Sequence, residues 1–483
     1  MKKSTKRIGI TCTSIFHYVH FKYIVNELRE RGFNVDYIIY TPKYTNNRFE
    51  RIEKYFKDNN ERFQSFEDVF SGNVKYDALL APYFMPGFEL LDSSIIKIRI
   101  MYGYAKDSWN YAEWNKGFDL ILSYGPYATK RLINYTEVVE IGHPRVRLDY
   151  KNEIIDINGR SFIKVECQKP ILVYCPTWAN LSSLEIFTTY LTEITIHFEV
   201  IVKLHHGNVL AGSHESLKVI KQNQDLYLFD DHTDLFDLLN AADIILSDYS
   251  GAIFDAMIFK KPIILLDVIP EYIRETGQVN LSNMLNVNSS FSKESFANFT
   301  TSLDIAIREI LSHVREKNEL LNTLIDALER NTVTYESLLE KLYYSIDTRG
   351  SVRGATAVEN FLIENDSSGI IIDNSLQVVN IEKVKDFLHF NSGETITIWG
   401  AGEIGQIIYV YLKSQGYSIN FLYDGDTNKQ GKNFYDKQIS SILIYSKVLI
   451  ATANAYQFIK ETLEKKGLHE GLDFISIFSR DDI

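Results

Sequence analysis

The sequence predicts an α/β fold in which doubly wound parallel sheets recur along the chain. Three features predict it: short apolar runs alternate with helical patterns, polar turns follow the apolar runs, and a glycine-rich turn opens a helix near the C-terminus. Buried strands separated by amphipathic helices are typical of parallel sheets that helices cover on both faces. At roughly 150 residues per domain, the 483 residues provide for about three such domains.

The first domain is expected over residues 1–150. Residues 7–12, 17–31 and 35–40 have the pattern of a strand, a helix and a strand, with Gly32 at the C-cap of the helix. Helical or polar stretches separate the later strands, as a parallel sheet requires. These later strands are predicted at 78–81, 98–101, 120–123 and 138–141.

A second domain is expected over residues 165–346, after a polar connector. Helical spacing from 292 to 346 is expected to brace this domain. Residues 347–392 are expected to be a linker, because their first part is rich in glycine and charge, and 393–483 are expected to form a third domain. The strands predicted in the second domain are 171–174, 200–204, 226–229, 244–247 and 263–266, with helices near 185–195, 214–223, 234–240 and 251–259.

Charge and composition narrow the class of partner. The net charge of -12 gives the protein no general electrostatic attraction to nucleic acid, whose binding usually requires a basic face. No stretch has the roughly 18 consecutive apolar residues of a membrane span. The cysteines Cys12, Cys167 and Cys175 are widely spaced, which fits a reducing compartment. We therefore expect a cytoplasmic protein, with peripheral contact to the inner face of the plasma membrane and homo-oligomerisation left open.

A polar turn after the apolar run 244–247 has the pattern of an anion site. Asp248, Ser250 and Gly251 lie between this strand and a predicted helix. Ser250 at the N-cap and the small Gly251 would let free backbone N–H groups and the positive end of the helix dipole approach a phosphate. An ordinary capped helix between two buried strands would show the same local pattern.

Two further turns of the same domain favour the phosphate interpretation. Thr177 follows the first predicted strand of the domain, and His205 follows the second. Ligands of open α/β sheets bind at the carboxyl ends of the strands, where all three turns fall. Because a histidine has an unperturbed pKa near 6.5, His205 could donate to a phosphate or move a proton at neutral pH.

Several blocks of the sequence resemble the CDP-glycerol glycerophosphotransferase family, the enzymes of teichoic-acid-type polymers. The resemblance covers about residues 98–270. It implies a two-domain fold of the GT-B type, with CDP held by the second domain. It also implies that His205, Ser250 and Gly251 contact the donor phosphates and that Thr177 lines the same pocket. The blocks are IGHPRV at 141–146, LVYCPTW at 172–178, KLH at 203–205, DYSG at 248–251, Phe254-Asp255, Lys261-Pro262 and Asp267.

The sequence departs from this family at the expected catalytic base. Those enzymes commonly have Trp-His-Gly-Thr in the first domain, with the histidine proposed as the base, whereas Tyr102 stands at the histidine position here. A tyrosine with a pKa of about 10 is a poor base at pH 7. Candidate replacements are Asp107, His143 and the first βα loop with His17 and His20. His206 likewise stands where the family usually has a proline.

The expected reaction is an inverting displacement at an activated phosphorus, or at an anomeric carbon if the donor is a sugar nucleotide. A base would deprotonate the acceptor hydroxyl while His205 and the helix N-terminus stabilise the leaving phosphate. No metal motif is evident, and no cofactor is expected for the transfer. Asp248 and Asp255 could together hold Mg²⁺, but we expect Asp248 to order the turn and Asp255 to cap or pair locally.

The C-terminal domain carries a nucleotide-binding pattern. Gly400, Gly402 and Gly405 form a G-x-G-x-x-G turn between a predicted strand and a helix, and Asp424 follows the next strand about twenty residues on, where it could meet a ribose hydroxyl. This part resembles the small Rossmann domain appended to bacterial surface-glycan enzymes. A NAD-like nucleotide is therefore a candidate ligand, and redox chemistry, nucleotide sensing, donor handling and oligomerisation all remain open.

Three functions are compatible with the sequence. The first is transfer of glycerol phosphate or a related polyol phosphate from a CDP-activated donor to a capsule or teichoic-acid-like acceptor, glycan or lipid-linked. The second is a GT-B glycosyltransferase that uses a UDP- or CDP-sugar. The third is a non-catalytic nucleotide-binding scaffold of glycan assembly, which the missing base and the appended domain suggest.

Overall fold

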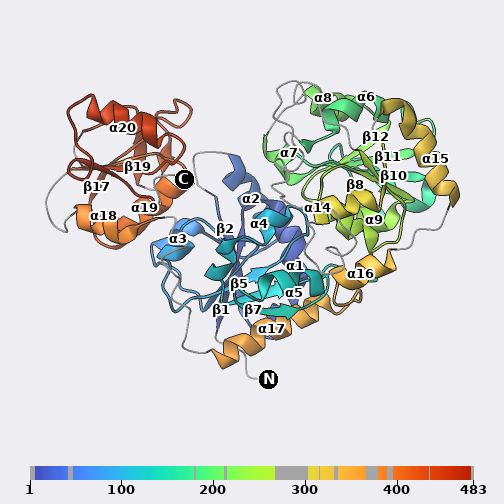
Figure 1. Ribbon diagram of the computed structural model, residues 1–483, viewed down its shortest axis with the longest axis horizontal. Helices are drawn as coiled ribbons and strands as arrows, with labels where there is room; N and C mark the ends of the chain where they lie inside the picture. The colour runs from blue at the N-terminus through green and yellow to red at the C-terminus, as the bar shows by residue number, and fades with distance from the viewer. Residues whose placement is uncertain are drawn as a thin grey trace.

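Three sheets of mainly parallel strands organise the chain, one in each expected domain (Figure 1). In the described ranges, no helix is both long and apolar enough to cross a membrane. The first domain lies between the other two. The computed structural model describes residues 6–41, 47–178, 181–211, 215–266, 303–314, 316–330, 335–365, 379–388, 395–434, 436–445 and 447–479.

The first sheet has seven parallel strands in the order β3-β2-β1-β4-β5-β6-β7. Its central strands are mostly apolar and buried along nearly their whole length, as expected where helices cover both faces. Gly32 has a φ of 93° just beyond the first helix, which matches its predicted place. The strands are β1 (Arg7–Cys12), β2 (Asn34–Ile39), β3 (Phe63–Ser65), β4 (Ala78–Ala81), β5 (Ile96–Ile100), β6 (Leu120–Ser123) and β7 (Glu137–Glu140); the helices are α1 (Ile15–Glu30), α2 (Asn47–Asp58), α3 (Phe66–Phe70), α4 (Asp107–Asn110) and α5 (Pro126–Leu132).

The second sheet has six parallel strands in the order β12-β11-β10-β13-β14-β15. The order reverses beside β10, so the turns after β10, β11 and β13 are neighbours at one sheet edge. The strands are β10 (Ile171–Cys175), β11 (Glu199–Lys203), β12 (Leu226–Phe229), β13 (Ile244–Ser247), β14 (Ile263–Leu266) and β15 (Ser312–Val314); the helices are α6 (Leu184–Ile194), α7 (His206–Ala211), α8 (Glu215–Gln222), α9 (Leu235–Ala241), α10 (Ala252–Met257), α14 (Leu303–Ala306) and α15 (Leu320–Arg330).

Two connecting stretches contain structure that the sequence did not predict. The polar connector forms an antiparallel hairpin of β8 (Glu153–Ile155) and β9 (Ser161–Ile163). The expected linker 347–392 includes α17 (Gly350–Glu364), which packs on α1, and α18 (Ile381–Leu388). Helix α16 (Glu336–Leu342) contacts α5 of the first domain, and its Glu336 lies 3.5 Å from Nζ of Lys260 in the second, so it braces both domains.

Glycine explains why the helix α17 was mistaken for a linker. A Cβ on Gly350 would lie 2.5 Å from the carbonyl oxygen of His143, and one on Gly354 would lie 3.1 Å from Cδ1 of Ile24. Both glycines therefore permit a close helix approach, whereas in the sequence they read as helix breakers.

The third domain packs against the first through α19 (Glu403–Ser414) and α3. A Cβ on Gly87 would lie 2.8 Å from Cγ2 of Ile407, so this contact is close. Its sheet has the order β18-β19-β17-β16-β20-β21. The remaining elements are β16 (Ile396–Trp399), β17 (Ile419–Tyr423), β18 (Asn433–Phe434), β19 (Lys437–Ser440), β20 (Lys447–Ile450), β21 (Phe474–Ser476) and α20 (Tyr456–Glu464).

Candidate functional site

A cavity of about 450 Å³ lies between the first and second domains. Its walls are loops that follow the strands of both sheets, so it lies at the carboxyl ends of two parallel sheets. Lining residues from the first domain include Phe16, His20, Tyr83, Tyr102, Gly103, Ala105, Lys106, Trp109 and Asn110. Those from the second domain include 175–178, 203–206, 249–252 and Asp255.

Five of the predicted donor-site residues line this cavity: Thr177, His205, Ser250, Gly251 and Asp255. Four of them come from the turns after β10, β11 and β13, as the sequence pattern predicted, and Asp255 comes from the helix α10 that follows the last turn. The structure therefore brings together residues that are up to 78 positions apart, since Thr177 and Asp255 share one wall. Asp267, which belongs to the same sequence block, lies outside the described residues.

Asp248 does not line the cavity but holds its wall in place. Its buried carboxylate accepts hydrogen bonds from the backbone N–H groups of Thr177 (2.7 Å), Ser183 (2.9 Å) and Tyr249 (2.6 Å). Burial raises the pKa of Asp248, although these hydrogen bonds oppose the rise. The residue therefore ties the turn after β13 to the loop after β10, in line with the turn-ordering role expected for it.

The helix after Gly251 is shorter and begins later than the sequence suggested. The N-cap of α10 is Gly251 rather than Ser250, and the helix spans six residues. The Oγ atom of Ser250 still accepts from the N–H of Ala252, the first residue of the helix, at 3.3 Å. A Cβ on Gly251 would lie 3.4 Å from Cβ of Ala105 in the first domain. Glycine therefore permits close approach of the two cavity walls, while so short a helix contributes only a small dipole.

His205 is held as a neutral hydrogen-bond donor. Its Nδ1 accepts from the backbone N–H of Gly207 at 3.0 Å, so the neutral ring carries its proton on Nε2. Burial, reinforced by the neighbouring side chains of His206, Lys106 and Lys203, holds the pKa of His205 well below its ordinary value. This side chain is suited to donating to a phosphate oxygen rather than to moving a proton.

Three cationic side chains make the cavity wall suitable for an anion: Lys106, Lys203 and Arg145. Lys106 has a left-handed backbone with a φ of 63°, and its Nζ lies 5.7 Å from the centre of the Trp178 ring. Burial lowers the pKa of Lys203. Cations beside neutral donors are the usual surroundings of a bound diphosphate.

The structure does not bring Asp107 or His143 to the cavity wall, and we correct these two predictions of a catalytic base. Asp107 accepts from the hydroxyl of Tyr127 at 2.5 Å and lies 3.3 Å from the guanidinium of Arg131 inside the first domain. His143 is fully buried, with Nε2 lying 3.3 Å from a carboxylate oxygen of Asp255. Sequence position alone did not reveal which way either side chain faces.

The other expected replacements are also unsuited to act as the base. Tyr102 does line the cavity, but burial raises its pKa further above neutrality. His20 accepts from Nη1 of Arg145 at 3.2 Å through Nδ1, and its Nε2 lies 2.7 Å from the hydroxyl of Tyr124. Both ring nitrogens of His20 are therefore occupied. Burial lowers the pKa of His17 to about 3, and His17 does not reach the cavity wall.

Sequence reasoning did not identify His206 as a candidate base. It stacks on Phe16 of the first domain, with ring centres 4.8 Å apart, and its ring lies 4.1 Å from that of His205. Its Nδ1 is buried and forms no hydrogen bond with any described residue. Burial lowers its pKa to about 4, so the ring is neutral at pH 7. The one signal in the sequence was a histidine where the resembling family usually has a proline.

Buried ion pairs hold the two domains together beside the cavity. Arg145 follows β7 of the first domain and donates to Asp234, the N-cap of α9, at 2.5 Å. Arg147 reaches the same carboxylate at 3.3 Å, and the hydroxyl of Tyr23 donates to it at 2.9 Å. Although burial alone would raise it, Arg145, Lys22 and Arg147 hold the pKa of Asp234 well below its ordinary value. This network fixes how the two domains face each other.

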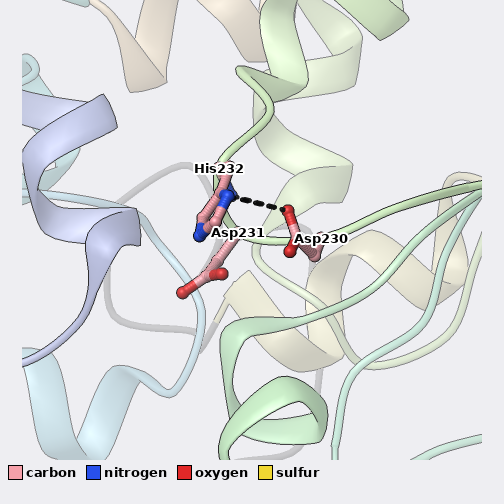
Figure 2. Close-up of side chains that lie close together, drawn as sticks. All are labelled: Asp230, Asp231 and His232. Atoms are coloured by element: carbon pink, nitrogen blue, oxygen red, sulfur yellow. Dashed lines mark hydrogen bonds and ion pairs between the residues drawn. The ribbon is translucent and has the colours of Figure 1, made fainter. Parts of the chain in front are cut away.

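Asp230, Asp231 and His232 lie close enough together to hold a metal ion, and among the described residues they are the one such group. Figure 2 shows them on the loop that follows β12. Arg51 of the first domain already donates to Asp231 at 3.0 Å and contacts His232 at 2.9 Å. A guanidinium thus occupies the position that a cation would take, and the group is separate from the cavity wall. Asp248 and Asp255 have other partners and form no such group.

Two Rossmann-like domains that share a cavity at the carboxyl ends of their sheets form a fold of the GT-B type. Residues 107–285 match the family described as CDP-Glycerol:Poly(glycerophosphate) glycerophosphotransferase. This segment of the chain is similar to that family. It includes the complete second-domain wall of the cavity.

Two curated relatives each match about a third of the chain. A teichoic acid glycerol-phosphate transferase of Staphylococcus aureus is 24% identical over 157 residues, which are 30% of this chain and 40% of the relative. A teichoic acid poly(glycerol phosphate) polymerase of Bacillus spizizenii is 24% identical over 185 residues, 34% of this chain and 45% of the relative. The chain thus spans less than half the length of either relative.

Similar solved structures include two proteins of low sequence identity. The wall teichoic acid polymerase TagF is 12% identical with a TM-score of 0.46, over 75% of this chain and 90% of that one. The Arabidopsis thaliana protein UGT89C1, solved with UDP, is 13% identical with a TM-score of 0.44, over 74% of this chain and 100% of that one.

Proposed function

We propose that the protein transfers glycerol phosphate or a related polyol phosphate from a CDP-activated donor to a capsule or teichoic-acid-like acceptor. The observation that supports this most is the wall formed by neutral His205, Ser250 and Gly251 within the segment of the glycerophosphotransferase family. An Nε2–H donor, a hydroxyl and backbone N–H groups can all donate to diphosphate oxygens, and Lys106 and Lys203 balance their charge.

In the proposed reaction, an acceptor hydroxyl oxygen attacks the phosphorus that carries the polyol. A new P–O bond forms, the P–O bond to CMP breaks, and CMP leaves with the electron pair. His205 donates to the departing phosphate, which lowers the barrier where negative charge develops. His206 is our candidate for the group that takes the hydroxyl proton. It lines the cavity, and its Nδ1 accepts no hydrogen bond from any described residue. A bound diphosphate beside His206 would raise its pKa and make it a better base.

Calorimetric titration with CDP-glycerol tests the donor site. We expect His205→Ala and Ser250→Ala to weaken binding, because each removes a donor to a charged group. His197→Ala is a matched control, since His197 is exposed at the opposite end of β11. Unchanged affinity in both cavity variants would exclude this assignment.

A GT-B glycosyltransferase is the second candidate, and Tyr102 is the observation that favours it. The family histidine is absent at that position, so the acceptor chemistry could differ. The released nucleotide separates the two functions: polyol-phosphate transfer releases CMP, whereas sugar transfer releases CDP or UDP. Turnover with a panel of CDP-polyols and UDP- and CDP-sugars therefore decides between them. Tight binding without turnover would instead support a scaffold.

A further inference from the structure

A second cavity, of about 600 Å³, lies beside the sheet of the C-terminal domain. It is lined by the turns that follow β16, β17 and β20, which are adjacent parallel strands. This is the edge at which open α/β sheets bind ligands. Pro86 of the first domain completes one wall. This second cavity shares no lining residue with the cavity between the first and second domains, which we call the donor cavity.

The fold itself requires two of the three glycines in the turn after β16. Gly400 has a φ of 116°, and a Cβ there would lie 2.9 Å from the carbonyl oxygen of Ala451. A Cβ on Gly405 would lie 1.7 Å from the carbonyl oxygen of Gly400. Both positions therefore exclude a side chain regardless of any ligand.

Gly402 is different, because neither its backbone nor its neighbours require glycine. Its φ of -76° and ψ of -173° are open to any residue, and a Cβ there would meet no atom within 4 Å. The space that this missing side chain leaves lies on the cavity wall. A glycine there keeps room for a group that approaches the backbone closely.

The backbone beside Gly402 is arranged to receive a negatively charged group. Gly402 is the N-cap of α19, a helix of 12 residues, and no side chain caps it. The first N–H groups of a helix have no intrahelical partner, and the dipole of a helix of this length favours an anion there. Open space, uncapped N–H groups and a cavity thus coincide.

Asp424 is fixed on the same wall, at the end of β17. One carboxylate oxygen accepts from the N–H of Ala401 at 2.7 Å and from Nζ of Lys429 at 3.0 Å, and the other accepts from the N–H of Asp426 at 2.9 Å. These bonds hold the carboxylate rigid, and the second oxygen keeps acceptor capacity for a hydroxyl. A ribose diol is the group whose donors match this position.

An aromatic side chain at the cavity edge completes the pattern. Phe458 of α20 lines the cavity and is 69% exposed. An exposed ring beside a polar cavity can stack on a planar group, and a nucleobase offers such a face.

We propose that this cavity binds a ribonucleotide with an unmodified ribose, placing a phosphate at Gly402, the ribose hydroxyls at Asp424 and the base beside Phe458. A dinucleotide such as NAD⁺ and a nucleoside-diphosphate sugar share this chemistry. A 2′-phosphate would meet the carboxylates of Asp424 and Asp426, so NADP⁺ should bind more weakly than NAD⁺. Because Pro86 contributes to the wall, the bound ligand would also contact the first domain. This proposal is independent of the function proposed for the donor cavity.

The test is calorimetry on the full chain with NAD⁺, NADP⁺ and UDP-N-acetylglucosamine, the last in a His205→Ala background that weakens the donor cavity. We expect NAD⁺ or UDP-N-acetylglucosamine to bind. Which of the two binds shows whether the ligand is a dinucleotide or a nucleoside-diphosphate sugar. NADP⁺ should bind at least tenfold more weakly than NAD⁺ if the dinucleotide is the ligand.

Gly402→Ala is the decisive variant, because it fills only open space and adopts an ordinary backbone. It should weaken binding at least tenfold while leaving the circular dichroism and unfolding midpoint unchanged. Ser414→Ala, at the opposite end of α19, is the matched control and should bind as the wild type does. Absence of binding by every nucleotide at millimolar concentration, or equal affinity of the Gly402→Ala variant, would overturn the proposal.

Discussion

Replacing Asp234 with asparagine should remove the charge that joins the two domains while leaving local structure intact. The carboxylate accepts from Arg145 at 2.5 Å and lies 3.5 Å from Nζ of Lys22. It also caps α9 by accepting from the N–H of Phe236 at 3.1 Å. Asparagine is as good an N-cap as aspartate, so Asp234→Asn should keep the cap and lose only the charge.

The expected cost follows from burial of the pair. The side chains of Arg145 and Asp234 are 1% and 3% exposed. Removing one partner of a buried ion pair destabilises a protein by about 3–5 kcal/mol, because the other charge stays buried. We expect the lower end, since Arg145 also lies 3.7 Å from Asp255. At about 2–4 °C per kcal/mol, the unfolding midpoint of the two-domain part should fall by roughly 6–12 °C.

Asp347→Asn is the control, because Asp347 also pairs with an arginine, Arg353, but its side chain is 41% exposed. An exposed pair contributes about 0–1 kcal/mol. The pKa of Asp234 is lowered in the folded protein, so its contribution is fully present above the unfolded pKa of about 4 and is lost as the pH falls below it. The stability difference between wild type and Asp234→Asn should thus be constant from pH 5 to 8 and shrink in more acidic solution. Equal midpoints for Asp234→Asn and Asp347→Asn at pH 7 would refute the reasoning.

Three further predictions concern the cavities. His205→Ala should weaken CDP-glycerol binding about 10- to 100-fold in calorimetry, since a hydrogen bond to a charged group contributes about 1.5–3 kcal/mol; an unchanged dissociation constant contradicts this. His206→Ala should lower kcat about 10²- to 10⁴-fold with donor affinity nearly unchanged, and a loss confined to affinity would show that His206 is no base. Burial, opposed by Arg48, raises the pKa of Glu403 at the nucleotide cavity to about 7. Because an ionised Glu403 repels phosphate, nucleotide affinity should fall as the pH rises above about 7, and Glu403→Gln should abolish this dependence.

The buried strands could be predicted from sequence almost residue by residue. The apolar runs at 120–123, 226–229 and 244–247 coincide with β6, β12 and β13, because strands covered on both faces are apolar at nearly every position. The helix α17 could not be predicted, since its glycines are required by the partners they pack against rather than by its own backbone. A local sequence pattern predicts the conformation of its own segment. It does not predict which distant element will pack closely against that segment.

The candidate site was predictable only where strand ends determine it. Thr177, His205 and Ser250 were found because they follow strands that topology makes adjacent. Arg145 and Asp234 were missed because they are 89 positions apart and belong to different domains, so nothing in either segment indicates the other. These turns belong to one domain, whereas the Arg145–Asp234 pair depends on how two domains meet.

Arg145 belongs both to the contact between the domains and to the donor cavity. Its guanidinium pairs with Asp234 and also lines the cavity. While paired with Asp234 and lying 3.7 Å from Asp255, its charge is largely balanced before any donor binds. Neutralising Asp234 leaves one more unit of positive charge at the cavity wall. An added charge at roughly 8 Å from a diphosphate contributes on the order of 1 kcal/mol even in strongly screened surroundings. Asp234→Asn should therefore lower stability and strengthen donor binding about fivefold, two effects of opposite sign that simple misfolding would not produce together.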